Sequence, residues 1–167
     1  MPELVPWFLF LHVLGAIIAF GPAFSFPIIG AMGAADRTHS NFATRVSHAI
    51  STKRSIPVGL TLPVTGIGLI WSAGIDPLSR DARWLALGIL LYVVLLTFAL
   101  TIQIPTTERI IGMTAGPPPE APPDAAPSGP PPALMALIRK VQRGGLFLSV
   151  MVAVIVFLMV AKPDLGF

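Results

Sequence analysis

Apolar residues run almost without interruption through four stretches of the chain, and charged residues gather between them. Asp, Glu, Lys and Arg are absent from residues 4–35, 55–75, 84–107 and 144–161. About 20 apolar residues of helix cross a bilayer core roughly 30 Å thick. The stretches do not alternate polar and apolar positions, as the strands of a membrane barrel would. The pattern predicts an all-α, polytopic membrane protein with four transmembrane helices in an antiparallel bundle. The expected helices cover residues 5–32, 56–74, 84–106 and 142–161.

The two longer connections between these helices differ in character. Within residues 33–55, Phe42, Val46 and Ile50 recur every four positions, which predicts a short cytoplasmic amphipathic helix lying on the membrane surface. Residues 116–132 hold nine prolines in seventeen positions, as expected of an extended, solvated linker. On either side of this linker we expect helices three and four to continue into the cytoplasm, with Glu108 pairing with Arg139 or Arg143. The whole chain, 1–167, is then one transmembrane domain.

Basic residues predict how the helices are oriented. Eight of the eleven Lys and Arg residues lie in or beside the loops 33–55 and 107–142. Because Lys and Arg are enriched in cytoplasmic loops, both termini are expected outside. Trp7, Trp71 and Trp84 fall at the outer ends of the helices, where aromatic rings gather. The formal net charge of +3 is thereby explained by topology and does not indicate a nucleic-acid partner.

One ionisable residue, His12, stands within the apolar stretch from Phe8 to Gly30. Ionisable residues inside a membrane are candidates for function because an unpaired one is costly. A neutral imidazole suits a haem iron or a copper ion. The alternative is a structural histidine that is hydrogen-bonded to a hydroxyl or carbonyl group on a neighbouring helix. The chain has no Cys, so Met151 and Met159 are the soft candidates for a second ligand. We take His12 and Met151 as the candidate cofactor-binding residues, and His12 as the metal ligand.

Other chemistry in the expected membrane cores is sparse. Without Cys, disulfides and thiolate metal sites are excluded. Proton pumps and ion-coupled transporters place ionisable residues on their pathways, and no Asp, Glu, Lys or Arg lies in these cores. The sequence also contains no nucleophile–base pair, nucleotide-binding loop or metalloprotease motif. It therefore identifies no catalytic residue, and whether the protein is an enzyme stays open.

Two segments of the chain carry a resemblance to known proteins. They are "FLHVLGAIIAFGPAFSFPIIG" and "RVSHAISTKRSIPVGLTLPVTGIGLIW". The chain resembles the bacterial four-helix membrane proteins around HemJ and CopD in three features. These are the early His followed by small residues, the basic run before helix two, and a Pro and a Gly within helix two. The resemblance is strongest to a sister family of predicted integral membrane proteins of unknown function. It implies a multi-pass protein of the bacterial plasma membrane.

The resemblance also implies a cofactor. HemJ-type proteins oxidise protoporphyrinogen IX and bind b-type haem through a helix-one histidine, to which His12 corresponds. CopD-type proteins are linked to copper. Residues 84–106 contain no lysine to match the other haem-site residue of HemJ-type proteins, so the resemblance implies haem b rather than the oxidase activity.

Three hypotheses about function follow. The first is a membrane protein that binds b-type haem in a redox or haem-handling role. The second is a non-catalytic subunit or scaffold of a larger membrane complex, or a homo-oligomer. The third is a copper or small-solute permease. The lipid bilayer is the expected partner in all three, and a visible spectrum distinguishes the first from the others.

Overall fold

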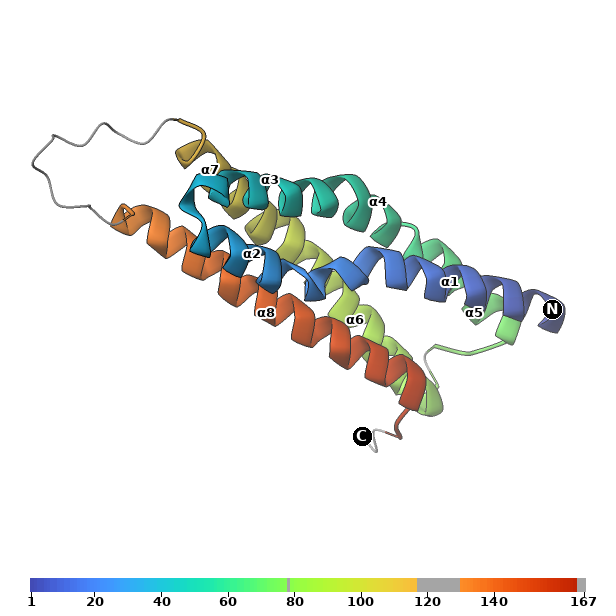
Figure 1. The fold of residues 1–167 in the computed structure, drawn as a ribbon. Helices are drawn as coiled ribbons and strands as arrows, with labels where there is room; N and C mark the ends of the chain where they lie inside the picture. Colours follow the sequence, from blue (N-terminus) through green and yellow to red (C-terminus); the bar gives the residue numbers. More distant parts are fainter. Residues whose placement is uncertain (78, 117–129, 165–167) are drawn as a thin grey trace, which may run out of the picture.

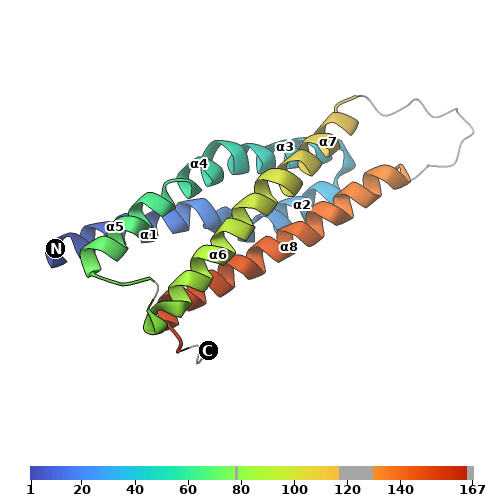
Figure 2. The same ribbon diagram turned by 180° about the vertical axis from the view of Figure 1, so that it is seen from behind.

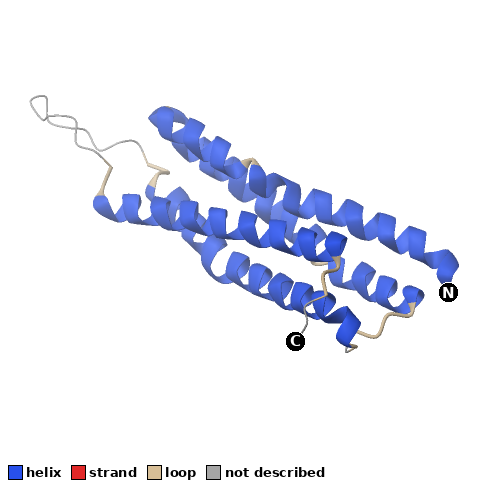
Figure 3. Cartoon of the chain, turned by 90° about the horizontal axis from the view of Figure 1, so that it is seen from below, coloured by secondary structure: helices blue, strands red, loops and turns tan. Residues whose placement is uncertain are grey.

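Four long helices make up the described part of the chain. The computed structural model describes residues 1–77, 79–116 and 130–164. In these ranges the chain is helical with short loops and no strand (Figure 3). The helices Pro2–Ala35, Ser40–Ala73, Arg80–Met113 and Pro132–Ala161 are each long and apolar enough to cross a membrane. The predicted all-α class with four candidate spans is thereby confirmed, whereas most of the expected linker 116–132 lies outside the described residues.

The first long helix is interrupted near its middle. It comprises a 3₁₀ turn Pro2–Leu4, α1 (Val5–Phe20), a second 3₁₀ turn Gly21–Phe24, and α2 (Phe26–Ala35). Pro22 and Pro27 have no backbone N–H and cannot continue the α-helical hydrogen-bond ladder. The chain bridges the break with a 2.9 Å bond from Ser25 N–H to the Pro22 carbonyl oxygen.

The second long helix begins much earlier than the predicted residue 56. It contains α3 (Ser40–Ile50), a π turn Ser51–Ser55, α4 (Ile56–Gly59) and α5 (Leu62–Ala73). Residues 40–50 are thus helical and continue directly into the rest of this long helix. Their place on the membrane surface stays a prediction. α3 contacts α2 and α7, and Phe42 of its apolar pattern is 66% exposed.

The third and fourth long helices both extend beyond their predicted apolar spans. The third comprises a 3₁₀ turn Arg80–Ala82, α6 (Arg83–Phe98), a π turn Ala99–Gln103 and α7 (Ile104–Met113). The fourth is α8 (Pro132–Ala161). Helix therefore continues past Pro105 and begins ten residues before residue 142. This confirms that both helices extend as predicted, and their place in the cytoplasm stays a prediction.

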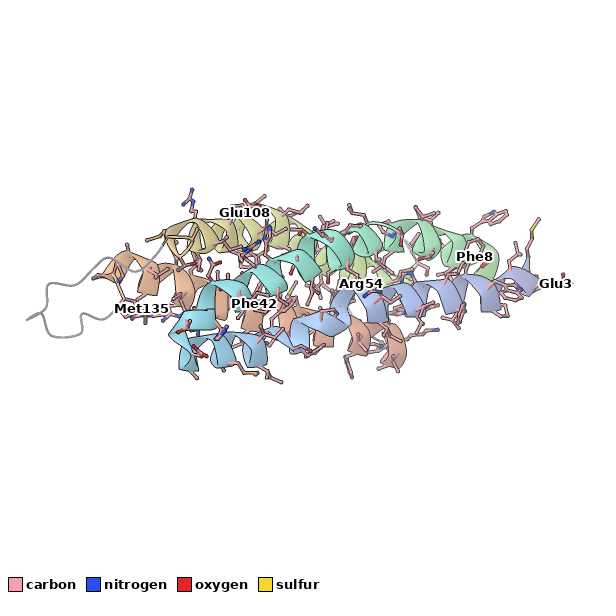
Figure 4. All side chains as sticks on the ribbon, turned by 45° about the horizontal axis from the view of Figure 1, so that its top comes forward. Glu3, Phe8, Phe42, Arg54, Glu108 and Met135 are labelled. Carbon is pink, nitrogen blue, oxygen red and sulfur yellow. The ribbon has the colours of Figure 1, made fainter. Side chains whose placement is uncertain are left out.

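Consecutive long helices run in opposite directions. α1 packs on α5 and α2 on α3, while α6 and α7 pack along α8 (Figures 1 and 2). A contact between α3 and α7 joins the two halves. The N-terminus and the C-terminal end of α8 lie at the same end of the molecule (Figure 1). Glu3 marks this end, and Phe42, Glu108 and Met135 lie toward the other (Figure 4).

Irregular turns occur at one level in three of the long helices. Gly21 lies 19 residues from Pro2, Ser55 lies 18 from Ala73, and Ala99 lies 19 from Arg80. At 1.5 Å per residue, each is about 27–29 Å from the end of the molecule that holds the termini. We call this level the collar. It lies about one hydrocarbon thickness from that end.

Two buried clusters hold α6 against α8. One contains Ala82, Trp84, Leu85 and Leu158, and the other contains Leu95, Val152 and Ile155. Trp84 is only 9% exposed, whereas Trp7 and Trp71 are 69% and 63% exposed. The Lys162 ammonium group lies 5.4 Å from the centre of the Trp84 ring. Two of the three tryptophans therefore face outward as an interfacial belt requires, and Trp84 instead packs inside the bundle.

Candidate functional site

His12 lies on the face of α1 that packs against α5. Phe8, His12, Gly15 and Ala19 recur every three or four residues and so share this face. Glycine residues of the second long helix lie opposite this face. A Cβ added at Gly68 would overlap the Phe8 ring, and one added at Gly66 would stand 3.4 Å from His12 Cε1. Glycine thus lets the ring-bearing side chains of α1 approach the backbone of α5.

The imidazole of His12 is held by one hydroxyl group. His12 Nδ1 lies 2.9 Å from Thr65 Oγ1, and Thr65 Oγ1 lies 3.1 Å from the Leu62 carbonyl oxygen. Both contacts are satisfied when Nδ1–H donates to Thr65 and the Thr65 hydroxyl donates to Leu62. In that tautomer Nε2 carries the lone pair. The arrangement fixes which ring nitrogen is able to bind a metal.

Met151, the candidate second ligand, occupies a different part of the bundle. It packs against the cluster of Leu95, Val152 and Ile155 between α6 and α8. Phe20 of α1 reaches the same cluster, and His12 lies eight residues, or about 12 Å, from Phe20 along the helix. The structure therefore does not bring Met151 and His12 together.

Met159 is nearer the C-terminal end of α8, but it packs elsewhere. Its terminal methyl group lies over Gly88 of α6. In the described part of the chain, no group of three or more His, Asp or Glu side chains could hold a metal ion. His12 is thus a candidate as a single protein ligand.

Residues 7–163 match the family described as predicted integral membrane proteins, DUF2269. The chain belongs to this family. No curated protein and no solved structure matches it. The four long helices of this DUF2269 protein agree with the family description, which names no ligand and no activity.

Sequence reasoning missed a second polar contact of this DUF2269 protein, at Tyr92. The Tyr92 hydroxyl of α6 donates to the Gly59 carbonyl oxygen at 2.9 Å. In a regular α-helix that carbonyl would accept from residue 63, but Pro63 has no N–H. Tyr92 therefore satisfies a buried acceptor that the proline leaves without its helical donor. Pro63 could have predicted this contact from the sequence. A proline has no N–H, so the carbonyl four residues earlier in the helix needs another donor.

This explanation predicts a coupling between Tyr92 and Pro63. Tyr92→Phe should lower the free energy of unfolding by about 1–2 kcal/mol, because Gly59 loses its donor. In the Pro63→Ala protein a backbone N–H becomes available to Gly59, so the same substitution should cost much less. Thermal unfolding in detergent of the two single variants and the double variant measures the difference. Equal costs of Tyr92→Phe in both backgrounds would contradict the explanation.

The other histidines of this DUF2269 protein lie toward the opposite end from the termini. His39 Nδ1 is 2.7 Å from Asp36 Oδ2, and this hydrogen bond lowers the pKa of the Asp36 carboxyl below its ordinary value. His48 Nε2 is 3.7 Å from Glu108 Oε1. Glu108 therefore faces His48, and not the predicted partners Arg139 and Arg143.

Proposed function

We propose that this membrane protein binds b-type haem through His12, as a single protein ligand, in a redox or haem-handling role. The observation that supports this is the contact between His12 Nδ1 and Thr65. Histidines that ligate metals usually donate their other ring N–H to a neighbouring acceptor, which fixes the tautomer and the ring orientation. Thr65 is such an acceptor, and it leaves Nε2 available for the iron.

His12 is the residue that would hold the iron, through Nε2. Thr65 would hold the ring by its contact with Nδ1, and the absence of a side chain at Gly66 leaves room for the ring beside α5. Met151 would not act as a second protein ligand, because it packs with Leu95 and Val152. When bound, haem would supply one-electron chemistry. This chain would provide a neutral nitrogen ligand in an apolar surrounding.

The visible spectrum of the purified full-length protein tests the proposal. Protein produced with an adequate haem supply should show a Soret band of the b type. A second sample, purified without colour and then incubated with haemin, should acquire the same band at one haem per chain. Protein that stays colourless after both treatments would exclude a haem site.

A non-catalytic subunit or scaffold is the second candidate, and a specific observation favours it. The contact with Thr65 satisfies the Nδ1–H donor of His12 without any ligand. Tyr92 and Gln103 likewise donate across helices, to the carbonyl oxygens of Gly59 and Val141. These polar side chains then serve to join helices. A complex of defined larger mass after mild detergent extraction, from colourless protein, would favour this role.

We also propose an orientation, with both termini outside the plasma membrane of a bacterium. Arg80, Arg83 and Lys162 lie at the end that holds the termini, and the other eight basic residues lie at or beyond the collar. Arg143 and Arg54 lie 18 and 19 residues from the outer ends of their helices. The resulting distance of about 27–29 Å is close to the thickness of a hydrocarbon core.

Reporter fusions test this orientation. A chain that ends at Gly116 and continues into a fluorescent reporter should fluoresce, because that reporter folds in the cytoplasm. The same chain fused to a phosphatase that is active only outside should be inactive. Fusions after Ser79 should give the opposite pair of results. An active phosphatase after Gly116 would overturn the orientation.

A further inference from the structure

A groove with a basic wall lies between the third and fourth long helices at the level of the collar. Its volume is about 630 Å³. Arg139, Lys140 and Arg143 of α8 line one part of it. Phe98, Ile102 and Phe147 line another. We call this feature the collar groove.

The three cations of the collar groove are exposed and have no partner among the described residues. Arg139 and Arg143 are four residues apart and therefore share one face of α8. Glu108, which could have neutralised them, faces His48 instead. No carboxylate lines the groove within the described part of the chain. Its positive charge is thus available to an anion.

The apolar wall lies on the membrane side of these charges. The Phe98 and Phe147 rings pack at 4.9 Å between centroids, with 59° between their planes. Phe147 is four residues beyond Arg143 and eight beyond Arg139, or about 6 and 12 Å along the helix axis. The groove therefore changes from charged to aromatic over a distance that suits the junction of a lipid headgroup and its acyl chains.

Close packing fixes the two helices that form the collar groove. Gln103 Nε2 donates to the Val141 carbonyl oxygen at 3.1 Å. A Cβ at Gly144 would overlap Gln103 Oε1 and stand 3.2 Å from the Phe98 ring. The π turn Ala99–Gln103 supplies both Ile102 and Gln103. Such turns often occur where a helix serves a binding function.

We propose that the collar groove binds one anionic phospholipid. Arg139, Lys140 and Arg143 would contact the phosphate, and an acyl chain would lie along Phe98 and Phe147. The guanidinium group is suited to phosphate because its donors match two oxygens at once. Basic pockets between transmembrane helices on the cytoplasmic side hold anionic headgroups in this way. The aromatic wall favours a lipid over a small free anion. The proposal does not depend on haem binding at His12.

Lipid retention by the purified full-length protein tests the proposal. The protein in mild detergent is titrated with dioleoyl phosphatidylglycerol, and bound lipid is counted by native mass spectrometry. We expect one retained lipid per chain. Because each basic residue contributes to anionic-lipid binding, Arg139→Gln with Arg143→Gln should weaken retention about tenfold or more. Phosphatidylcholine should be retained much less by the unsubstituted protein.

A matched control has the same change in charge outside the groove. Arg54 lies at nearly the same depth as Arg143, and Arg109 lies beyond the collar. Both are exposed, and neither lines the groove. Arg54→Gln with Arg109→Gln should leave retention within twofold of the unsubstituted protein. An equal loss in both double variants would overturn the proposal, because it would mean attraction to the net charge alone.

Two further measurements separate a lipid from a free anion. Phe147→Ala should weaken retention of the dioleoyl lipid, and inorganic phosphate at the same concentration should not displace that lipid. Displacement by phosphate, or retention that Phe147→Ala leaves unchanged, would identify an anion site and overturn the lipid. Equal retention of phosphatidylcholine would also overturn the proposal, because the cations would then have no role.

Discussion

His12→Ala should abolish the Soret band of the haem-loaded protein, because alanine offers no nitrogen to the iron. The protein should still accumulate in the membrane, since four long apolar helices insert by their own hydrophobicity. Loss of the bond to Thr65 should cost little stability, because hydrogen bonds between membrane helices contribute about 0.6 kcal/mol on average. Spectra at matched protein concentration, together with thermal unfolding of the same samples, measure both effects.

Two companion variants make the His12 experiment specific. Thr65→Val removes the acceptor for Nδ1–H with little change in volume, so it should weaken haem affinity by about 10–100-fold without abolishing the band. Met151→Leu should leave the band unchanged, because Met151 packs between α6 and α8 and not beside His12. A band that survives His12→Ala would assign the haem to another residue. A band lost on Met151→Leu would contradict the single-ligand proposal.

Gly68→Val should be the most destabilising single substitution in the packing of α1 against α5. Even a Cβ at this position would overlap the Phe8 ring, and an aromatic ring cannot bend out of the way. Overpacking of this kind typically costs about 1–3 kcal/mol. The effect should therefore appear as a clear fall in the thermal midpoint in detergent, followed by tryptophan fluorescence.

Gly88 and Phe8 provide the controls for this substitution. A Cβ at Gly88 would meet only the terminal methyl group of Met159, which has several rotatable bonds and can move. Gly88→Ala should therefore be tolerated. In a Phe8→Ala background, Gly68→Val should cost much less than in the unsubstituted protein. If Phe8→Ala leaves its cost unchanged, the ring contact is not what makes Gly68 necessary.

Much of the fold could be predicted from the gaps between charged residues. Stretches without charge identified four membrane helices, and the continuation past Pro105 followed from an ordinary helical pattern. The π turns could not be predicted, because Pro57 and Pro105 indicate only that a hydrogen bond is missing. Whether a helix bends or takes an extra residue there depends on its neighbours. The amphipathic pattern of residues 40–50 does not by itself distinguish a lipid surface from contacts with α2 and α7, because both select the same spacing, so the surface position stays a prediction.

Only part of the candidate site could be predicted from the sequence. His12 was identifiable because it interrupts an apolar helix. Its partner Thr65 was not, because several hydroxyl groups lie at similar depths on other helices. Met151 was chosen by residue type, and neither type nor sequence position specifies which pair of helices a side chain faces. Such facing depends on helix rotation within the bundle, which the packing of Gly66 and Gly68 against α1 determines.

An added or missing residue at the collar changes the rotation of the helix that follows it. Each π turn holds one residue more than the α-helical repeat would, so the helix after it is turned by about 100° relative to an uninterrupted helix. A relative that lacked one residue between 99 and 103 would have a regular α-helix there. Its α7 would then present a different side to α3, and the position of Glu108 would turn away from His48. A single-residue gap at the collar would therefore indicate that two relatives differ in how α3 and α7 face each other, even where their helices between the collar and the termini are alike.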